Sequence, residues 1–183
     1  KEKLTAAKEA GYDGVELSVD ESDERLSRLD WSAAQRQDLL RASRETGIRL
    51  PSLCLSGHRR YPLGSRDPQT CLLYTSPSRD PQTVRRGMAI LEKAVRLAGD
   101  LGIRLIQLAG YDVYYEPSAP DTAARFAENL QHAVSIAAAD GVTLGFETME
   151  TPFMNTTKKA MTHIRRVKAP YLQIYPDIGN ITH

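Results

Sequence analysis

The 183-residue sequence predicts an α/β fold with about five parallel strands and flanking helices. Its main indication is a recurring unit, in which an amphipathic helical stretch ends at a glycine that leads into a short run of β-branched and apolar residues. Glycine readily supplies the left-handed residue that ends a helix, and these runs are too short to form another helix. The unit occurs around Gly11, Gly47, Gly102 and Gly141. Such alternation of helices and strands favours a parallel sheet with right-handed crossovers.

Polar residues follow the strand-like runs and are a second indication of the same fold. They are Asp20, Ser56, Tyr111, Glu147 and Asp177, the last of which belongs to a fifth run that follows Ala169-Pro170. Because parallel strands end at one edge of a sheet, these residues are expected to share one polar face. That face is the working face of a (β/α) barrel or of an open α/β sheet.

In the first half of the chain, capping signals predict two helix starts. Residues Asp20 to Arg25 form an acidic turn that we expect to begin a short helix. Ser32 with Gln35 three residues later is a capping box, and Trp31 before it would staple the first turn. The helix that they open is expected to end at Gly47.

In the second half, helices are indicated by an apolar face and by further caps. Asp121 is expected to cap the helix that follows the third strand. Asn155 or Thr156 is expected to start the last helix, which reaches Val167. An apolar face at helical spacing precedes both, formed by Met88, Leu91, Val95 and Ala98.

Composition limits the classes of function. With 24 Lys and Arg against 23 Asp and Glu, the net charge of +1 gives no electrostatic reason to expect a nucleic acid or a membrane as partner. Cys54 and Cys71 have no companions at metal-motif spacing and do not suggest a disulfide framework. No apolar run reaches the roughly 20 residues of a membrane helix, and Lys1 leads into an amphipathic helix instead of a secretion signal. We expect one cytoplasmic domain over residues 1–183, with no nucleic acid and no membrane partner.

One segment interrupts the regular order of elements. Ser65-Arg66-Asp67-Pro68-Gln69-Thr70 is repeated letter for letter as Ser78-Arg79-Asp80-Pro81-Gln82-Thr83, an offset of 13 residues. The spacing from Gly47 to Gly102 is correspondingly long. We interpret residues 71–83 as a duplication or artefactual insert in a surface loop, and the alternative is a lid over the site.

Glu147 and Asp177 are the candidate metal ligands. Each ends a run whose apolar residues would be buried, and a buried carboxylate is costly unless it is paired or binds a cation. Adjacent parallel strands lie about 4.8 Å apart, so both carboxylates could bind one divalent ion. A salt bridge at the strand end is the structural alternative. Glu16 interrupts an apolar run in the same way and is expected to point inward.

Candidate substrate-binding residues lie at the same predicted face. Ser56, His58 and Arg59 follow the second strand, in a loop that could hold a phosphate or sugar hydroxyls. Alternatively the arginines of this loop are solvated and His58 packs. Gln107 and Tyr111, with Asp112, are expected to line the pocket from the third strand. His132 and His163 fall mid-helix and far from any strand end, where we expect packing or surface roles.

Several stretches closely resemble the L-ribulose-5-phosphate (L-xylulose-5-phosphate) 3-epimerases, a family also described as hexulose-6-phosphate isomerase-like, within the xylose-isomerase-like TIM barrel superfamily. The resemblance covers essentially the whole chain except residues 71–83, which that family lacks. The matching stretches are Val15 to Glu21, Asp23 to Trp31, Cys54 to Ser56, His58 to Arg60, Gln107 to Tyr115 and Tyr175 to Asn180.

The resemblance implies an incomplete TIM (β/α)8 barrel in which the first strand and the last strands are missing. It also implies one divalent metal ion (Zn, Mn or Mg) bound by Glu, Asp, His and Glu on successive strands. Glu147 and Asp177 match the first two ligands, and the other two would lie beyond residue 183. The implied partner is a small-molecule sugar phosphate, and a homodimer is a possible assembly.

The reaction implied is removal of the C3 proton of a ketopentose phosphate, an enediolate, and return of a proton to the opposite face. Inversion needs an acid and a base that face each other, and Glu147 would be one of them. We therefore expect the 183-residue polypeptide to be an inactive fragment that exposes apolar strand edges. The alternatives are a metal-barrel endonuclease, which the near-neutral charge disfavours, and a non-catalytic sugar-phosphate-binding module.

Overall fold

The computed structural model of the chain describes residues 1–65, 86–115 and 117–180. The predicted insert at 71–83 lies outside these residues. Helices and strands alternate along the chain, as predicted. In order they are α1 (Glu2–Glu9), β1 (Leu17–Ser18), α2 (Asp23–Leu26), η1 (Ser27–Asp30), α3 (Ala33–Thr46), β2 (Leu53–Leu55), η2 (Ser56–Arg59), α4 (Arg86–Leu101), β3 (Leu105–Leu108), α5 (Pro120–Ala139), β4 (Thr143–Glu147), α6 (Thr157–Val167) and β5 (Leu172–Tyr175).

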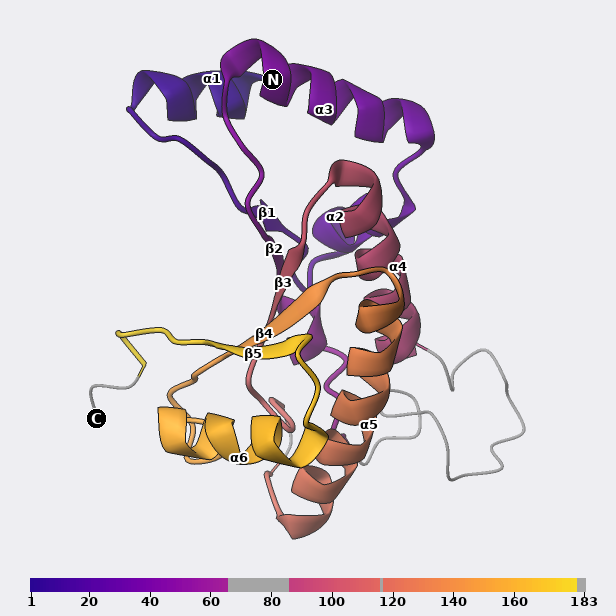
Figure 1. The fold of residues 1–183 in the computed structure, drawn as a ribbon, viewed down its shortest axis with the longest axis vertical. Helices are drawn as coiled ribbons and strands as arrows, with labels where there is room; N and C mark the ends of the chain where they lie inside the picture. Colours follow the sequence, from indigo (N-terminus) through magenta and orange to yellow (C-terminus); the bar gives the residue numbers. More distant parts are fainter. Residues whose placement is uncertain (66–85, 116, 181–183) are drawn as a thin grey trace.

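The five strands form one parallel sheet in the order in which they occur in the sequence, β1-β2-β3-β4-β5. Helices α4 and α5 run along one side of the sheet, α6 lies beside β5, and α1 and α3 lie together beyond β1 (Figure 1). Parallel neighbours joined by helices are the construction of a (β/α) barrel, of which this is a five-stranded part. The predicted fold class is confirmed.

The predicted helix ends are confirmed at the four glycines. Gly11, Gly47, Gly102 and Gly141 have φ between 65° and 83°, the left-handed region that other residues rarely adopt. At Gly47 the backbone N–H donates to the Ser43 carbonyl and ends α3. Each such turn sends the chain directly toward the next strand.

The predicted helix starts are confirmed in three cases and wrong in a fourth. The acidic turn at Asp20 to Arg25 leads into α2, whose N-cap is Ser22. The Ser32–Gln35 capping box is present, with Ser32 N–H donating to Gln35 Oε1 at 2.9 Å. Thr156, not Asn155, caps α6. The cap predicted at Asp121 is wrong, because the ring of Pro120 sets the backbone for the first helical position and α5 begins there.

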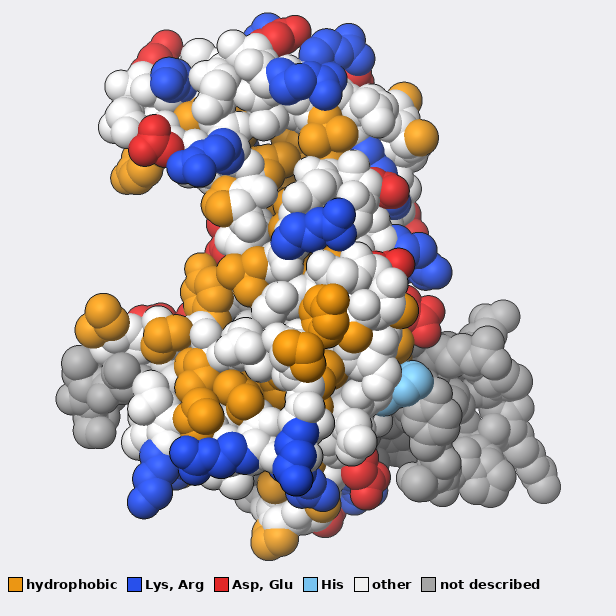
Figure 2. Space-filling model, in the orientation of Figure 1, with side chains coloured by type: hydrophobic (Ala, Val, Ile, Leu, Met, Phe, Trp, Pro, Cys, Tyr) orange, Lys and Arg blue, Asp and Glu red, His pale blue; other side chains and the backbone are white. Residues whose placement is uncertain are grey.

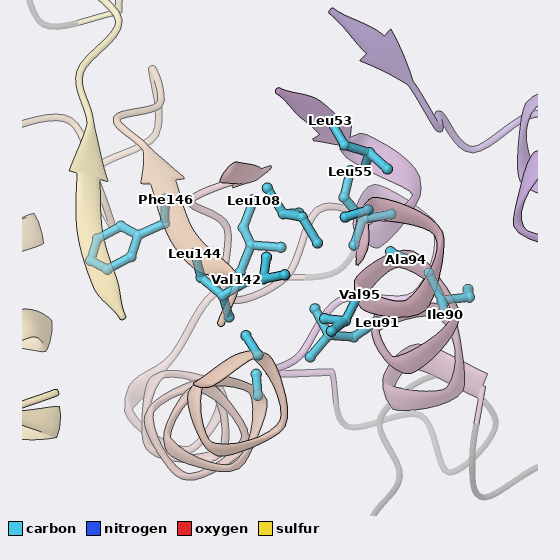
Figure 3. Packing of buried hydrophobic residues seen from close by; sticks show 14 of the residues in the cluster. Leu53, Leu55, Ile90, Leu91, Ala94, Val95, Leu108, Val142, Leu144 and Phe146 are labelled. Atoms are coloured by element: carbon cyan, nitrogen blue, oxygen red, sulfur yellow. The ribbon is translucent and has the colours of Figure 1, made fainter. Parts of the chain in front are cut away.

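The main hydrophobic core lies between the sheet and the helices that cover it. Alternate strand residues point to this side, among them Leu55, Leu108 and Leu144, and they meet Leu91 and Val95 of α4 (Figure 3). All five are at most 2% exposed. Since successive strand residues point to opposite faces, the intervening positions face the other side of the sheet.

That other side, the inner face, is mostly polar. The strand register aligns one row of inner-face residues across the whole sheet: Ser18, Cys54, Gln107, Gly145 and Gln173. The inner face and its carboxyl-terminal edge therefore carry the candidate site.

No helix of the described part of the chain is both long and apolar enough to cross a membrane.

Candidate metal and acid–base site

Glu147 is the last residue of β4 and is partly buried at the edge of the inner face. Its carboxylate is held by Gln107, whose Nε2 donates to Glu147 Oε2 at 2.5 Å. Gln107 is only 4% exposed, and its Oε1 is buried without a hydrogen-bond partner. The register pairs Gln107 with Gly145, two residues before Glu147, so the amide lies beside the carboxylate. Gln107 thus fixes the position of one oxygen of Glu147.

Asp177 lies two residues beyond β5, where the chain turns. Its carboxylate accepts from Gly179 N–H at 2.8 Å and from Asn180 Nδ2 at 3.0 Å. Thr148 ties this turn to the end of β4, because its Oγ1 accepts from Asp177 N–H at 2.9 Å and its carbonyl accepts from Asn180 Nδ2 at 3.0 Å. The ends of the two strands are thereby held together.

The two carboxylates interact with each other. Burial raises the pKa of Glu147 to about 7, and the charge of Asp177 and a hydrogen bond with it act in the same direction. The charge of Arg59 opposes this effect. Because two negative charges at such a site repel, a shared proton or a cation is needed to stabilise the pair.

This donor set suits a divalent cation. Carboxylate oxygens are preferred ligands of Mg²⁺ and Mn²⁺, and Glu147 has a raised pKa that a cation would lower. Across residues 1–65, 86–115 and 117–180, no group of three or more His, Cys, Asp or Glu side chains is placed to hold a metal. Glu147 and Asp177 are the two candidate ligands among the described residues, and the metal assignment stays a prediction.

Ser56 and His58, two predicted substrate residues, are both buried. His58 Nε2 lies 3.3 Å from the Gly87 carbonyl of α4, and burial lowers the pKa of His58 to about 4. The imidazole is therefore neutral near pH 7. Ser56 lies beside Cys54, whose pKa is raised to about 11 by burial and by the charge of Glu16, against a hydrogen bond with Ser56. Their predicted contact with substrate stays a prediction.

Arg59 ends η2, and Tyr111 lies three residues beyond β3, so both follow neighbouring strands of the sheet. The Tyr111 hydroxyl donates to both carboxylate oxygens of Glu150, at 2.9 and 3.0 Å. The Arg59 guanidinium lies over the ring of Tyr114, 5.6 Å from its centre, and Tyr114 packs edge-on against Tyr111. Tyr111 and Arg59 thus belong to one cluster at the carboxyl-terminal edge.

Sequence reasoning missed several residues of this region. Thr148 and Glu150 come one and three residues after Glu147, and their position just beyond a strand end was the signal that could have identified them. Glu16 accepts a hydrogen bond from Ser52 Oγ at 2.5 Å, which agrees with the inward direction predicted for it.

Two other predictions for ionisable side chains have different outcomes. Asp112, expected to line the pocket, is 1% exposed and accepts from Ser118 and Thr122 instead, so it stabilises the start of α5. His163 packs among Phe126, Phe146 and Phe153, as a packing role predicts.

Comparisons with known proteins agree with this architecture. Residues 4–183 match the family described as "Xylose isomerase-like TIM barrel". L-ribulose-5-phosphate 3-epimerase UlaE of Salmonella heidelberg (strain SL476) is 49% identical over 181 residues, which cover 98% of this chain and 59% of that protein. UlaE of Escherichia coli O139:H28 is 48% identical over 182 residues, with 99% and 59% covered. The chain thus spans 59% of the length of these curated relatives.

Solved structures resemble the fold at low sequence identity. A crystal structure of D-psicose 3-epimerase in the presence of D-fructose matches with a TM-score of 0.74 and 16% identity, covering 98% of this chain and 58% of that one. A xylose isomerase-like TIM barrel protein from Mycobacterium smegmatis in complex with magnesium matches with a TM-score of 0.69 and 14% identity, covering 98% and 56%.

Proposed function

This chain belongs to the xylose isomerase-like TIM barrel family, and on that premise we propose that the protein it represents is a sugar-phosphate 3-epimerase. The proposed reaction interconverts L-xylulose 5-phosphate and L-ribulose 5-phosphate by inverting the configuration at C3. It is supported by relatives 48 and 49% identical that are named L-ribulose-5-phosphate 3-epimerases.

The observation that carries the proposal is the pair of carboxylates at the ends of β4 and β5. Glu147 and Asp177 would together hold one divalent cation, which supplies stabilisation of the negative charge that develops on the substrate oxygens. Thr148 keeps the two strand ends together through its bonds to Asp177 and Asn180. The pair is therefore held in place before any ligand binds.

Glu147 is the proposed acid–base group at C3. In the metal-free chain, burial raises the pKa of this carboxyl to about 7, and the proposed cation would lower it and favour the ionised form that a base needs. Gln107 holds one carboxylate oxygen at 2.5 Å and leaves the other to receive the proton. Inversion further requires a second acid–base group on the opposite face of the sugar, which we do not assign to a described residue.

We further propose that the 183-residue polypeptide alone is inactive. Among the described residues, two carboxylates would leave the coordination sphere of a divalent cation incomplete, and one acid–base group can remove a proton without inverting the carbon. Measurable C3 epimerisation by the purified 183-residue chain would contradict this proposal.

Solvent-exchange measurements test the function in the protein that carries this chain. With L-ribulose 5-phosphate in deuterated water, we expect deuterium at C3 and formation of L-xylulose 5-phosphate. Both signals are expected to disappear on Glu147→Gln and on chelation with EDTA, and to persist in Glu92→Gln, a surface control on α4. Ligand binding without exchange, and unaffected by EDTA, would instead identify a non-catalytic binding module.

A further inference from the structure

Asn180, in the turn that follows β5, makes two hydrogen bonds at the carboxylate pair. Its Nδ2 donates to Asp177 Oδ2 and to the Thr148 carbonyl, at 3.0 Å in each case. A side-chain amide nitrogen carries two hydrogens, so both bonds can form at once. Thr148 directly follows Glu147, and Asn180 therefore connects the residue next to one candidate ligand with the carboxylate of the other.

Asp177 lies beyond the regularly paired part of its strand. The register between β4 and β5 ends at Glu147 and Tyr175, and among the described residues β5 pairs only with β4. Regular strand pairing therefore does not fix the Asp177 side chain. Burial and then the charge of Asp177 raise the pKa of Glu147, so the two ionised carboxylates repel each other. Without further contacts, this repulsion favours rotation of the Asp177 carboxylate away from Glu147.

The turn after β5 gives each oxygen of the Asp177 carboxylate one donor. Gly179 N–H donates to Oδ1 at 2.8 Å, and Asn180 Nδ2 donates to Oδ2. One such bond leaves the plane of the carboxylate able to rotate, whereas bonds to both oxygens fix that plane. Since a carboxylate oxygen has two lone pairs, each oxygen keeps one that a cation can use.

We propose that Asn180 is a positioning residue of the cation site, which holds the Asp177 carboxylate in the orientation that lets Asp177 and Glu147 share one divalent ion. This proposal rests on the proposed function and adds to it a residue that acts through Asp177. Hydrogen-bond partners of a ligating carboxylate orient it toward the metal, and their loss lowers metal affinity about 10- to 100-fold. Asn180 supplies such a partner and anchors it to the end of β4 through Thr148.

Asn155 provides a matched control for a change at Asn180. Its Oδ1 accepts from Lys159 Nζ at 2.7 Å, so its side-chain amide bonds within the start of α6. It is partly buried, as Asn180 is. Replacement by alanine therefore removes the same chemical group at both positions, but only at Asn180 does it remove a donor to Asp177.

Binding of Mn²⁺ alone to the protein that carries this chain, followed by the electron paramagnetic resonance signal of the free ion, tests the proposal. Asn180→Ala is expected to raise the Kd for Mn²⁺ about 10- to 100-fold, and Asn155→Ala to leave it within about twofold. The Mn²⁺ concentration for half-maximal epimerase activity should rise by the same factor as the Kd. The rate at saturating Mn²⁺ should return close to that of wild type.

Two results would overturn the positioning role. One is an unchanged Kd for Mn²⁺ in Asn180→Ala. The other is a rate that stays low in Asn180→Ala at saturating Mn²⁺, because it would indicate a damaged fold instead of a weakened ligand.

Mn²⁺ binding needs no sugar, so its outcome is separable from that of the epimerase proposal. If Mn²⁺ binding weakens in Asn180→Ala but the wild-type protein epimerises no sugar phosphate, the positioning role is supported and the epimerase assignment is wrong. If the wild-type protein epimerises and the Kd is the same in Asn180→Ala, the positioning role is wrong and the epimerase assignment stands. A wild-type protein that epimerises without binding Mn²⁺ would also overturn the positioning role.

Discussion

At the residue scale, the site depends on Glu147, a carboxylate whose partial burial destabilises its ionised form. Glu147 is partly buried beside Asp177, and its pKa of about 7 lies well above the ordinary value of 4.5. The burial that raises the pKa of Glu147 makes its ionised form unfavourable in the folded protein. A bound cation would reverse this effect, so the residue is best understood as a ligand and base whose partner comes from outside the chain.

Replacing Glu147 with Gln is expected to stabilise the fold at alkaline pH while abolishing activity. Because the folded pKa is above the unfolded one, ionisation of Glu147 costs stability as pH rises from about 4.5 through about 7. Glu147 is partly exposed, and solvent screening reduces the effect, so Glu147→Gln should gain about 1 to 2 kcal/mol at pH 8 and nearly none at pH 4.5. Denaturant unfolding at both pH values measures it, and an equal difference at both would contradict the assignment.

His58 is expected to weaken the fold in acid. Its folded pKa of about 4 lies below the unfolded value of 6.5, so the unfolded chain binds a proton first as pH falls between these values. The loss should approach roughly 3 kcal/mol by pH 4 and vanish above about pH 6.5. Subtracting the unfolding curve of His58→Gln isolates this contribution from that of the carboxylates. A His58→Gln variant with the same acid dependence as wild type would show that the imidazole is not responsible.

At the element scale, the site requires β3 and β4 to approach closely beyond their last paired residues. Gly110 follows β3, and a Cβ at this position would overlap the carbonyl oxygen of Glu147 and the side chain of Met154. The glycine therefore permits a backbone contact that no other residue allows without moving the end of β4. Gln107 makes its bond to Glu147 from the same strand, so the position of the carboxylate is determined by β3 as much as by its own strand.

In the protein that carries this chain, Gly110→Ala is expected to displace Glu147 and to reduce epimerase activity more than tenfold, with a loss of about 1 to 3 kcal/mol in stability. Gly99→Ala is the matched control, because a Cβ there meets no atom within 4 Å and alanine favours the helix by up to about 1 kcal/mol. Unfolding curves and initial rates are measured for both variants. Full activity in Gly110→Ala would show that the contact between the strands is not needed.

At the scale of the whole molecule, the parallel sheet has two edges. Strand β1 pairs only with β2, and β5 pairs only with β4, among the residues described. Helices α1 and α3 pack together through a separate hydrophobic cluster of Leu4, Ala42 and Ile48. A cavity of about 660 Å³ lies next to this cluster, and β1 forms part of its wall. Figure 2 shows this end of the molecule overhanging a hollow, while basic side chains lie over α6 at the other end.

The 183-residue polypeptide is expected to self-associate when it is expressed by itself. Among the described residues, the outer edges of β1 and β5 present unpaired backbone groups, and such edges are templates for pairing with other chains. Light scattering coupled to size exclusion should show an average mass that rises with concentration across the micromolar range. A monodisperse monomer with one cooperative thermal transition would contradict this expectation.

The sequence by itself determined the order of elements, the parallel fold class and the strand-end positions of Glu147 and Asp177. These features depend on local signals, namely the glycines that end helices, the Ser32 capping box and short apolar runs, which act within a few residues. Where two local signals competed, as at Asp121 and Pro120, the sequence alone did not identify the stronger one.

Only the tertiary structure decided what these residues contact. Gln107 and Glu147 are 40 residues apart, and only strand register brings the amide to the carboxylate. The stacking of Arg59 on Tyr114, the pairing of Arg60 with Asp23 and the burial of His58 likewise depend on segments distant in the chain. Burial and charge pairing arise when such segments pack together, and for that reason the carboxylate pair could be located from the sequence while its pKa and its supporting contacts could not.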